Sequence, residues 1–254
     1  MRTDHPGVPL TASEVAADAA ACVAAGVTEI HLHPRSDDGI ERLDAETVDK
    51  NVAAVKAMGV PVGVATGAWI EPDPGRRVAH VRAWHEPDFA SVNFSEPGAV
   101  EVAEALLHNG IGIEAGVWTV EDAQRLIASP VKTEILRVLI EPIRAHGVDE
   151  ALAVSADIHR ALDDGGVGVP RLQHGEGRAT WPVMRDAVRR GGLIRVGFED
   201  TLHLPDGRLA GSNVELVRAA LEIVVQCGGG SGRRGRAKEK SSACEIVLGH
   251  GWGT

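Results

Sequence analysis

Two histidines separated by one residue are the strongest chemical signal in this sequence. His31 and His33 stand at the end of a short run rich in β-branched residues, at positions 27–33. Alternate residues of a β-strand point to the same side, so both imidazoles project together. Neutral imidazoles are common ligands for Zn²⁺ and similar metals. The pair predicts a divalent metal site, although two hydrogen-bonded polar side chains in a strand-end turn would give the same pattern.

A second group of polar residues lies on the last strand expected before residue 200. Arg195, Gly197 and Glu199 alternate and therefore share one side of that strand. Gly197 leaves room for a ligand to approach the backbone. If the first and last strands are neighbours in a closed barrel, Glu199 converges with His31 and His33 as a His₂Glu zinc site with an open position. The alternative is an Arg195–Glu199 ion pair that only fills the interior, which is energetically poor.

Further titratable residues follow other expected strands. Asp200 points into a loop, where it could act as a general base if burial or a neighbouring carboxylate raises its pKa, or it could cap a turn. Glu114 and Glu141 stand at the end of two other strands, although Glu141 precedes Pro142 and could shape that turn. His174 could be a further ligand, a substrate contact or a turn residue.

Smaller polar groups and aromatic residues complete the same edge. Thr66, Ser91 and Asn93 suit hydrogen bonds to a carboxylate or carbonyl oxygen, and loop capping explains them equally well. Three tryptophans also follow strands, where they could line a pocket or simply pack: Trp69, Trp118 and Trp181.

Alternating helix and strand signals predict the scaffold that holds these residues. Thr11 and Glu14 form a capping box, and Gly26 supplies a left-handed stop for the first helix. Seven strands, each preceded by a helix, are expected at residues 27–33, 60–65, 89–93, 111–115, 135–140, 167–174 and 193–198. Such alternation implies a parallel sheet with crossover helices. No Gly-x-Gly-x-x-Gly motif follows a first strand, so we expect an α/β TIM (β/α)8 barrel rather than a dinucleotide-binding sheet.

This expected barrel, residues 1–227, apparently lacks its first strand. The chain begins with the loop and helix that should follow that strand. Residues 228–254 are rich in glycine and basic residues and show no apolar run before Ile246, so we expect a disordered C-terminal tail. A barrel short of one strand exposes two edges, and we expect such a chain to be unstable or inactive.

Composition narrows the class of protein. The 254 residues are 44% hydrophobic and 24% charged, with a net charge of −10. This acidic balance disfavours nucleic acid and anionic membranes as partners. No apolar stretch is long enough to span a membrane and no signal peptide is evident. The three cysteines lack a CxxC spacing or a nearby histidine, so we expect no disulfide framework or thiol catalysis, and a cytoplasmic location.

The motifs resemble those of the β-keto acid cleavage enzyme family over about residues 5–225. They are Thr11-x-x-Glu14, the His-x-His block at 30–35, and the Arg-Val-Gly-x-Glu-Asp block at 195–200. The resemblance implies a zinc-dependent TIM barrel that condenses a β-keto acid with acetyl-CoA and cleaves the product to acetoacetate and a new acyl-CoA. It also implies small-molecule partners and a homo-oligomer.

The resemblance assigns roles by position. The matching residues are His31, His33 and Glu199 as metal ligands, Arg195 as the anchor for the substrate carboxylate, Asp200 as the base, Glu114 as the carboxylate that supports the base, and Thr66 and Ser91 as substrate contacts. The family also has an acidic residue near its opening strand, for which Asp4 is the candidate.

Two other functions fit the sequence. A metal-dependent hydrolase of the amidohydrolase kind also carries a strand-end His-x-His in a barrel, but it usually needs further metal-site His and Asp residues, for which His174 is the only good candidate. A non-catalytic truncated barrel that binds metal or metabolite without turnover would follow from the missing strand.

Overall fold

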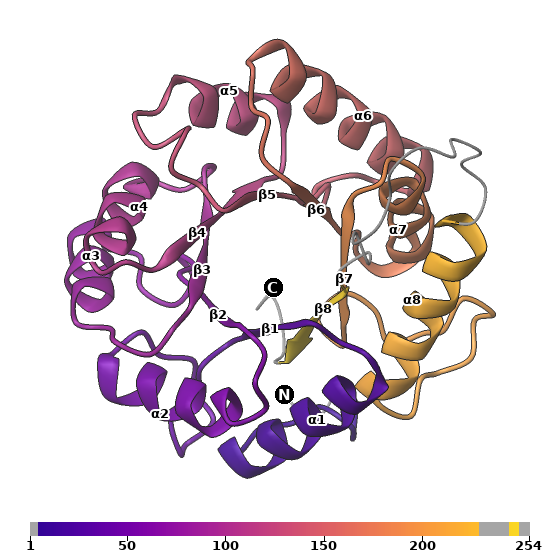
Figure 1. The fold of residues 1–254 in the computed structure, drawn as a ribbon, viewed down its shortest axis with the longest axis horizontal. Helices are drawn as coiled ribbons and strands as arrows, with labels where there is room; N and C mark the ends of the chain where they lie inside the picture. The colour runs from indigo at the N-terminus through magenta and orange to yellow at the C-terminus, as the bar shows by residue number, and fades with distance from the viewer. Residues whose placement is uncertain (1–4, 229–243, 249–254) are drawn as a thin grey trace.

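The computed structural model describes residues 5–228 and 244–248. Eight parallel strands form a closed barrel in the order β1 to β8, with the helices around it (Figure 1). The strands are β1 (Glu29–Leu32), β2 (Val62–Ala65), β3 (Phe89–Asn93), β4 (Gly112–Val117), β5 (Arg137–Ile140), β6 (Arg171–Gln173), β7 (Leu193–Gly197) and β8 (Cys244–Leu248). The helices are α1 (Ala12–Ala25), α2 (Ala45–Lys56), α3 (Pro74–Arg82), α4 (Ala99–His108), α5 (Val120–Ala128), α6 (Val148–Asp164), α7 (Thr180–Arg189) and α8 (Asn213–Gly228), with a short 3₁₀ turn η1 (Gly177–Ala179). The predicted TIM barrel is confirmed.

The strand that closes the barrel comes from the end of the chain. β8, yellow in Figure 1, lies between β1 and β7 and runs parallel to both. Glu245 pairs in register with Glu29 on one side and with Arg195 on the other. Ile246 and Leu248 are buried and join the hydrophobic core. Among the described residues, the elements therefore begin with a helix and end with a strand.

Two expectations about this region need correction. The barrel does not lack a strand, because β8 fills the place between β1 and β7. The expected disorder of residues 228–254 does not hold for Cys244–Leu248, which forms that strand. The remainder of the expected tail, 229–243 and 249–254, lies outside the described residues, as does Asp4.

The first helix begins and ends where the sequence predicts. The Thr11 hydroxyl accepts a hydrogen bond from the Glu14 amide at 3.2 Å, and the Glu14 carboxylate accepts one from the Thr11 amide at 3.0 Å. Gly26 ends the helix with φ 115°, a left-handed conformation that favours glycine. Within the described residues, no helix combines the length and apolar character needed to cross a membrane.

The two faces of the barrel strands have different chemistry. Outward side chains such as Ile30 and Val138 are fully buried beneath the helices. The inward face carries glycines and charged residues. A Cβ at Gly63 would collide with the ring of Phe89, which fills the interior from the neighbouring strand, and the Arg137 guanidinium lies over that ring at 4.8 Å. The interior is therefore packed with side chains, as expected for a barrel of this size.

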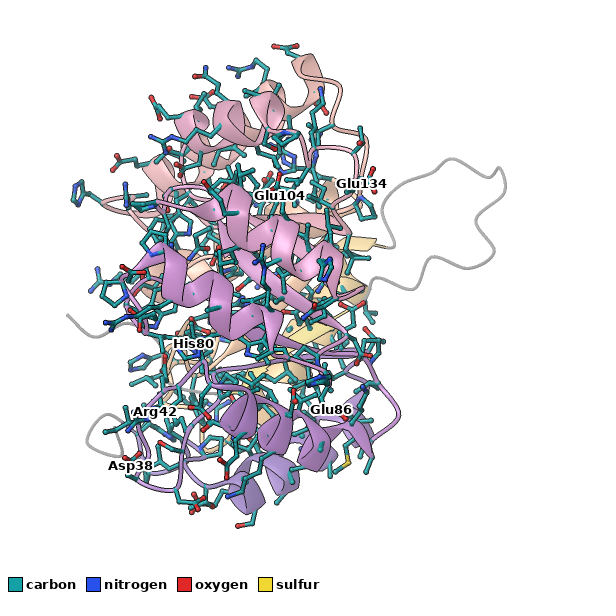
Figure 2. All side chains as sticks on the ribbon, turned by 90° about the vertical axis from the view of Figure 1, so that its left-hand side faces the viewer. Asp38, Arg42, His80, Glu86, Glu104 and Glu134 are labelled. Atoms are coloured by element: carbon teal, nitrogen blue, oxygen red, sulfur yellow. The ribbon has the colours of Figure 1, made fainter. Side chains whose placement is uncertain are left out.

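The loops that follow the strands gather at one end of the barrel. Figure 2 shows Asp38 and Arg42, in the loop after β1, toward one side of the molecule. Glu86 and Glu134, which precede β3 and β5, lie toward the opposite side. Because all strands are parallel, the side chains at their carboxyl ends converge at the first of these two ends.

Candidate active site

Three predicted metal ligands meet at this mouth of the barrel. The rings of His31 and His33 have centroids 5.5 Å apart. His33 Nε2 lies 3.2 Å from Glu199 Oε2, and Arg195 donates a hydrogen bond to the same oxygen at 2.8 Å. All four residues line one small pocket, together with Trp69, Ser91, Asn93 and Glu141. The residues do not come from adjacent strands as expected, because β8 separates β1 from β7.

The donor atoms suit a divalent metal ion. Ligands of a tetrahedral zinc site lie about 2.0–2.2 Å from the ion, which places two of them about 3.3–3.5 Å apart. The distance of 3.2 Å between His33 Nε2 and Glu199 Oε2 is close to this value. Two imidazoles and a carboxylate form a donor set that zinc uses in catalytic sites. These residues therefore fit the metal that the family resemblance implies.

Electrostatics couples the members of this group. Burial alone would lower the pKa of His33, but the carboxylates of Glu199 and Glu41 outweigh it and raise that pKa to about 10. Burial alone would raise the pKa of Glu199, but His33 and Arg195 hold it well below its usual range. Without a metal, these shifts favour a buried ion pair between a protonated His33 and an ionised Glu199. A metal bound to both would take the place of that proton.

A second carboxylate lies behind His33. Glu41 Oε2 is 3.5 Å from His33 Nδ1, on the side of the ring away from Glu199. Glu41 is itself held by Arg35, at 2.6 Å, and by the indole N–H of Trp69, at 3.0 Å. The Trp69 ring also stacks on His33 with centroids 6.2 Å apart. The orientation of the His33 ring is therefore fixed by contacts on two sides.

His31 has a different environment. Burial lowers the pKa of His31 well below its usual range, and the charge of Arg195 adds to this effect. The imidazole is thus neutral, as a metal ligand must be. Its Nδ1 atom is buried and has no hydrogen-bond partner among the described residues. The Oε1 atom of Glu245 lies 4.0 Å from this nitrogen.

The predicted base Asp200 belongs to a chain of three titratable side chains. Asp200 Oδ1 lies 2.8 Å from His174 Nδ1, and His174 Nε2 lies 2.8 Å from Glu141 Oε2. Burial alone would lower the pKa of His174, but Asp200 and Glu141 raise it to about 10 despite the opposing charge of Arg195. The second oxygen of Asp200, Oδ2, is buried without a hydrogen-bond partner in the described part of the chain.

Glu114, the predicted support for this base, contacts a different residue. It is fully buried in β4, and its Oε1 accepts a hydrogen bond from Arg137 Nε at 2.5 Å. The same guanidinium also donates to Glu29 and Glu245. Burial and the charge of Glu114 raise the pKa of Glu245 to about 8, against the effect of Arg137. The structure thus groups Glu114 with a charged layer beneath the mouth, whereas the contacts of Asp200 are with His174.

The smaller predicted contacts divide into two kinds. Ser91 and Asn93 line the pocket, and the Asn93 amide donates to Glu96 at 3.0 Å. The Thr66 hydroxyl donates to the Ser91 carbonyl at 2.7 Å, so it caps the backbone in this structure.

The three tryptophans that follow strands have different contacts. Trp69 lines the pocket, Trp118 donates to Glu141 at 3.2 Å, and Trp181 donates to the His203 carbonyl at 2.9 Å.

Sequence reasoning missed four charged residues around the site. These are Glu29, Glu41, Arg137 and Glu245. Two of them carried a detectable signal: Arg137 is a lone charge within an otherwise apolar strand, and Glu245 directly precedes the apolar run 246–248. The loop that contains Glu41 offers no comparable pattern.

A family comparison agrees with this geometry. The family model described as beta-keto acid cleavage enzyme matches residues 1–232. The chain belongs to the beta-keto acid cleavage enzyme family. This confirms the resemblance read from the His-x-His and Arg-Val-Gly-x-Glu-Asp blocks. The match ends before β8, so the strand that closes the barrel lies beyond it.

Two curated relatives cover most of this family member. It is 26% identical over 239 residues to the 3-keto-5-aminohexanoate cleavage enzyme of Fusobacterium nucleatum, covering 88% of this chain and 86% of the relative. It is also 26% identical over 251 residues to the enzyme of the same name from Acetoanaerobium sticklandii, with 88% and 87% coverage.

Solved structures share the fold of this family member. The apo structure of ObcA has a TM-score of 0.70 at 16% identity, covering 88% of this chain and 63% of ObcA. The ternary complex of ObcA with a C4-CoA adduct and oxalate has the same TM-score at 15% identity, with 96% and 66% coverage. The chain thus spans slightly less than two thirds of ObcA, and the likeness is one of fold.

Proposed function

We propose that this chain is a zinc-dependent β-keto acid cleavage enzyme that reacts a β-keto acid with acetyl-CoA to give acetoacetate and a new acyl-CoA. The observation that carries the proposal is the convergence of His33 Nε2 and Arg195 on one carboxylate oxygen of Glu199, beside His31. This arrangement combines a metal-ligand set with a cation that can bind the substrate's carboxylate.

His31, His33 and Glu199 would hold the metal. When bound there, zinc supplies Lewis-acid polarisation of the substrate's keto oxygen. The two imidazoles differ in protonation before the metal binds. His31 is already neutral, whereas His33 must lose the proton that Glu199 stabilises.

Arg195 is suited to anchor the substrate carboxylate. Its side chain lines the pocket and donates one hydrogen bond to Glu199. Its Nε is buried without a hydrogen-bond partner within the described residues. A guanidinium can bind a carboxylate with two parallel hydrogen bonds, which fixes the position of the substrate as well as attracting it.

Asp200 is suited to move the proton. One of its oxygens faces the protonated ring of His174, and the other has no partner among the described residues. The free oxygen can accept a proton from the carbon between the keto and carboxylate groups. His174 and Glu141 hold the carboxylate in place during this transfer.

The proposed reaction balances without an external oxidant or reductant. Asp200 removes the proton, and the resulting carbanion bonds to the acetyl carbon of acetyl-CoA, so that CoA leaves as the thiolate. The thiolate then attacks the original keto carbon, and the bond from that carbon to the central carbon breaks. The central carbon takes back the proton, giving acetoacetate and the new acyl-CoA.

Relatives support this choice of ligands. Two curated relatives are named for cleavage of a keto acid. ObcA, which shares the fold, has been solved with a C4-CoA adduct and oxalate and with oxaloacetate. We extend these ligand classes, a keto acid and a CoA thioester, to this chain. A homo-oligomer and a cytoplasmic location stay predictions.

The two alternative functions receive less support. A truncated, non-catalytic barrel was suggested by the missing strand, and β8 removes that reason. An amidohydrolase-like site needs further histidine ligands, and both ring nitrogens of His174 lie against carboxylates.

Metal analysis and product assays test the proposal directly. We expect one zinc ion per chain, and acetoacetate release from a panel of β-keto acids only when acetyl-CoA is present. Glu199→Gln should weaken zinc binding by more than about 100-fold, because loss of an outer-shell partner alone costs 10–100-fold. Glu86→Gln, at the opposite end of the barrel in Figure 2, is the matched control and should change neither quantity. Product formation without acetyl-CoA would instead indicate a hydrolase, and the absence of both zinc and acetoacetate would refute the proposal.

A further inference from the structure

Two buried polar atoms without partners face each other beneath the proposed metal site. His31 Nδ1 and Glu245 Oε1 are 4.0 Å apart, on side chains that are each 1% exposed. Neither atom has a hydrogen-bond partner in the described part of the chain. His31 comes from β1 and Glu245 from β8, the strand that closes the barrel.

Such atoms are costly to leave unpaired. A buried polar group without a hydrogen bond destabilises a protein, because it has lost its contacts with water and gained nothing in return. The His31 imidazole is neutral, so one ring nitrogen carries a proton and the other carries a lone pair. A proton on Nδ1 complements the acceptor Glu245 Oε1, and a small rotation of the ring or the carboxylate would bring the two atoms from 4.0 Å to hydrogen-bond distance.

The neighbouring histidine already shows this arrangement. His33 presents Nε2 to Glu199 and has Glu41 behind its Nδ1 at 3.5 Å. Metal-binding histidines almost always donate their second N–H to a carboxylate, a carbonyl or water, which fixes the tautomer and the ring orientation. A carboxylate behind His31 would complete a matching pair.

We propose that Glu245 is a positioning residue that accepts a hydrogen bond from His31 Nδ1 and thereby presents Nε2 to the metal. The inference rests on the proposed zinc site at His31, His33 and Glu199. It gives the last described strand a part in the chemistry: β8 closes the barrel and also orients a ligand that lies more than two hundred residues earlier in the sequence.

The layer beneath the mouth holds Glu245 in position for this role. Arg137 donates to the other oxygen of Glu245, Oε2, and is itself held by Glu29 and Glu114. Glu245 Oε1 has no hydrogen-bond partner among the described residues and is the oxygen left for His31. Glu29 binds the same arginine, and the described residues show no hydrogen bond or ion pair between Glu29 and His31, so it is the natural control.

One competing arrangement uses the same atoms. His31, Glu114 and Glu245 offer ligand atoms within 4.8 Å of one another, which could hold a second, interior metal ion. The guanidinium of Arg137 lies against both carboxylates, and its positive charge repels a second cation placed between them. The number of metal ions per chain separates the two arrangements.

Zinc titrations of the full chain and two matched variants test the proposal. Zinc affinity is measured by competition with a chromophoric chelator for the wild type, Glu245→Gln and Glu29→Gln. Each variant replaces one carboxyl partner of Arg137 with an amide. We expect Glu245→Gln to weaken zinc binding about 10-fold or more, within the range for outer-shell partners, and Glu29→Gln to change it by less than about 3-fold. Unfolding of the zinc-free proteins shows how far each change affects the fold itself.

The tautomer of His31 provides a readout that a purely structural role would not change. In ¹⁵N-edited NMR of the zinc-loaded wild type, we expect His31 to be protonated at Nδ1. Equal loss of zinc affinity in both variants, protonation at Nε2, or two zinc ions per chain would each overturn the role of Glu245 while leaving the proposed function standing. A wild-type chain that binds no zinc overturns both.

Discussion

A buried arginine, Arg195, lies at the barrel mouth and another, Arg137, lies in the layer beneath it, and the two are used differently. In the lower layer, Nε, Nη1 and Nη2 of Arg137 each donate to a separate carboxylate. At the mouth, Arg195 donates to Glu199 alone, and its Nε has no partner among the described residues. A guanidinium with every nitrogen occupied can only hold the structure together, whereas one with a free donor beside a pocket can bind a ligand. The comparison separates a structural use of buried charge from a functional one.

Replacing each arginine in turn is the strongest test of this contrast. Arg137→Met leaves three carboxylates without their cation, and we expect the free energy of unfolding to fall by about 3–5 kcal/mol. Arg195→Met should cost less stability, because Glu199 keeps His33 as a partner, and should mainly raise the KM for the keto acid. Urea unfolding and steady-state kinetics measure both effects.

An exposed arginine provides the baseline for these two variants. Arg208 pairs with Asp206 on the surface, and Arg208→Met should change the free energy of unfolding by less than about 1 kcal/mol. If Arg137→Met and Arg195→Met destabilise the protein equally, the proposed division between the two layers is wrong.

The lower layer also depends on β8, which can be tested through its apolar side chains. Ile246 is fully buried, so Ile246→Ala should lower the free energy of unfolding by about 2–5 kcal/mol. Val225, on α8, is 77% exposed, and Val225→Ala should have an effect within about 0.5 kcal/mol. Equal effects of the two changes, measured by chemical denaturation, would mean that Cys244–Leu248 does not pack in the barrel.

The mouth should show a pH dependence that comes from His174. The pKa of His174 is raised from 6.5 to about 10, so the folded state binds an extra proton between these two values. This contribution to stability is complete below about pH 6.5, declines as the pH rises, and is gone above about pH 10. In His174→Gln, the free energy of unfolding should therefore fall less steeply over this pH range than in the wild type. The difference should be smaller than the loss of stability caused by the core variants. Parallel slopes for wild type and variant would show that Asp200 and Glu141 do not hold this proton.

Local patterns predicted much of the site. His31 and His33 could be placed together because alternate residues of a strand share a side, and the same rule put Arg195 and Glu199 on one face. The capping box at Thr11 formed as expected, because it depends only on residues three apart. The rim position of Glu141 and the possible role of His174 as a rim contact were also visible from their place after strands.

Other features required contacts between distant segments. The three partners of Arg137 lie on β1, β4 and β8, and the sequence of the strand that carries Arg137 does not identify them. Glu114 was expected to support Asp200, but its position in the middle of β4 brings it to Arg137 instead. Glu41 reaches His33 only because the loop after β1 folds back over the mouth.

The sequence by itself determined the alternating elements, the barrel class and the polar residues at strand ends, because these depend on periodicities of two and 3.6 residues that any short segment carries. Tertiary structure alone decided that Cys244–Leu248 closes the barrel and that Glu245 lies beneath His31. The apolar run 246–248 follows a long stretch rich in glycine and basic residues, and its pattern alone does not show which two strands it joins. Its assignment as a barrel strand therefore depends on its pairing with β1 and β7, which only the tertiary structure shows.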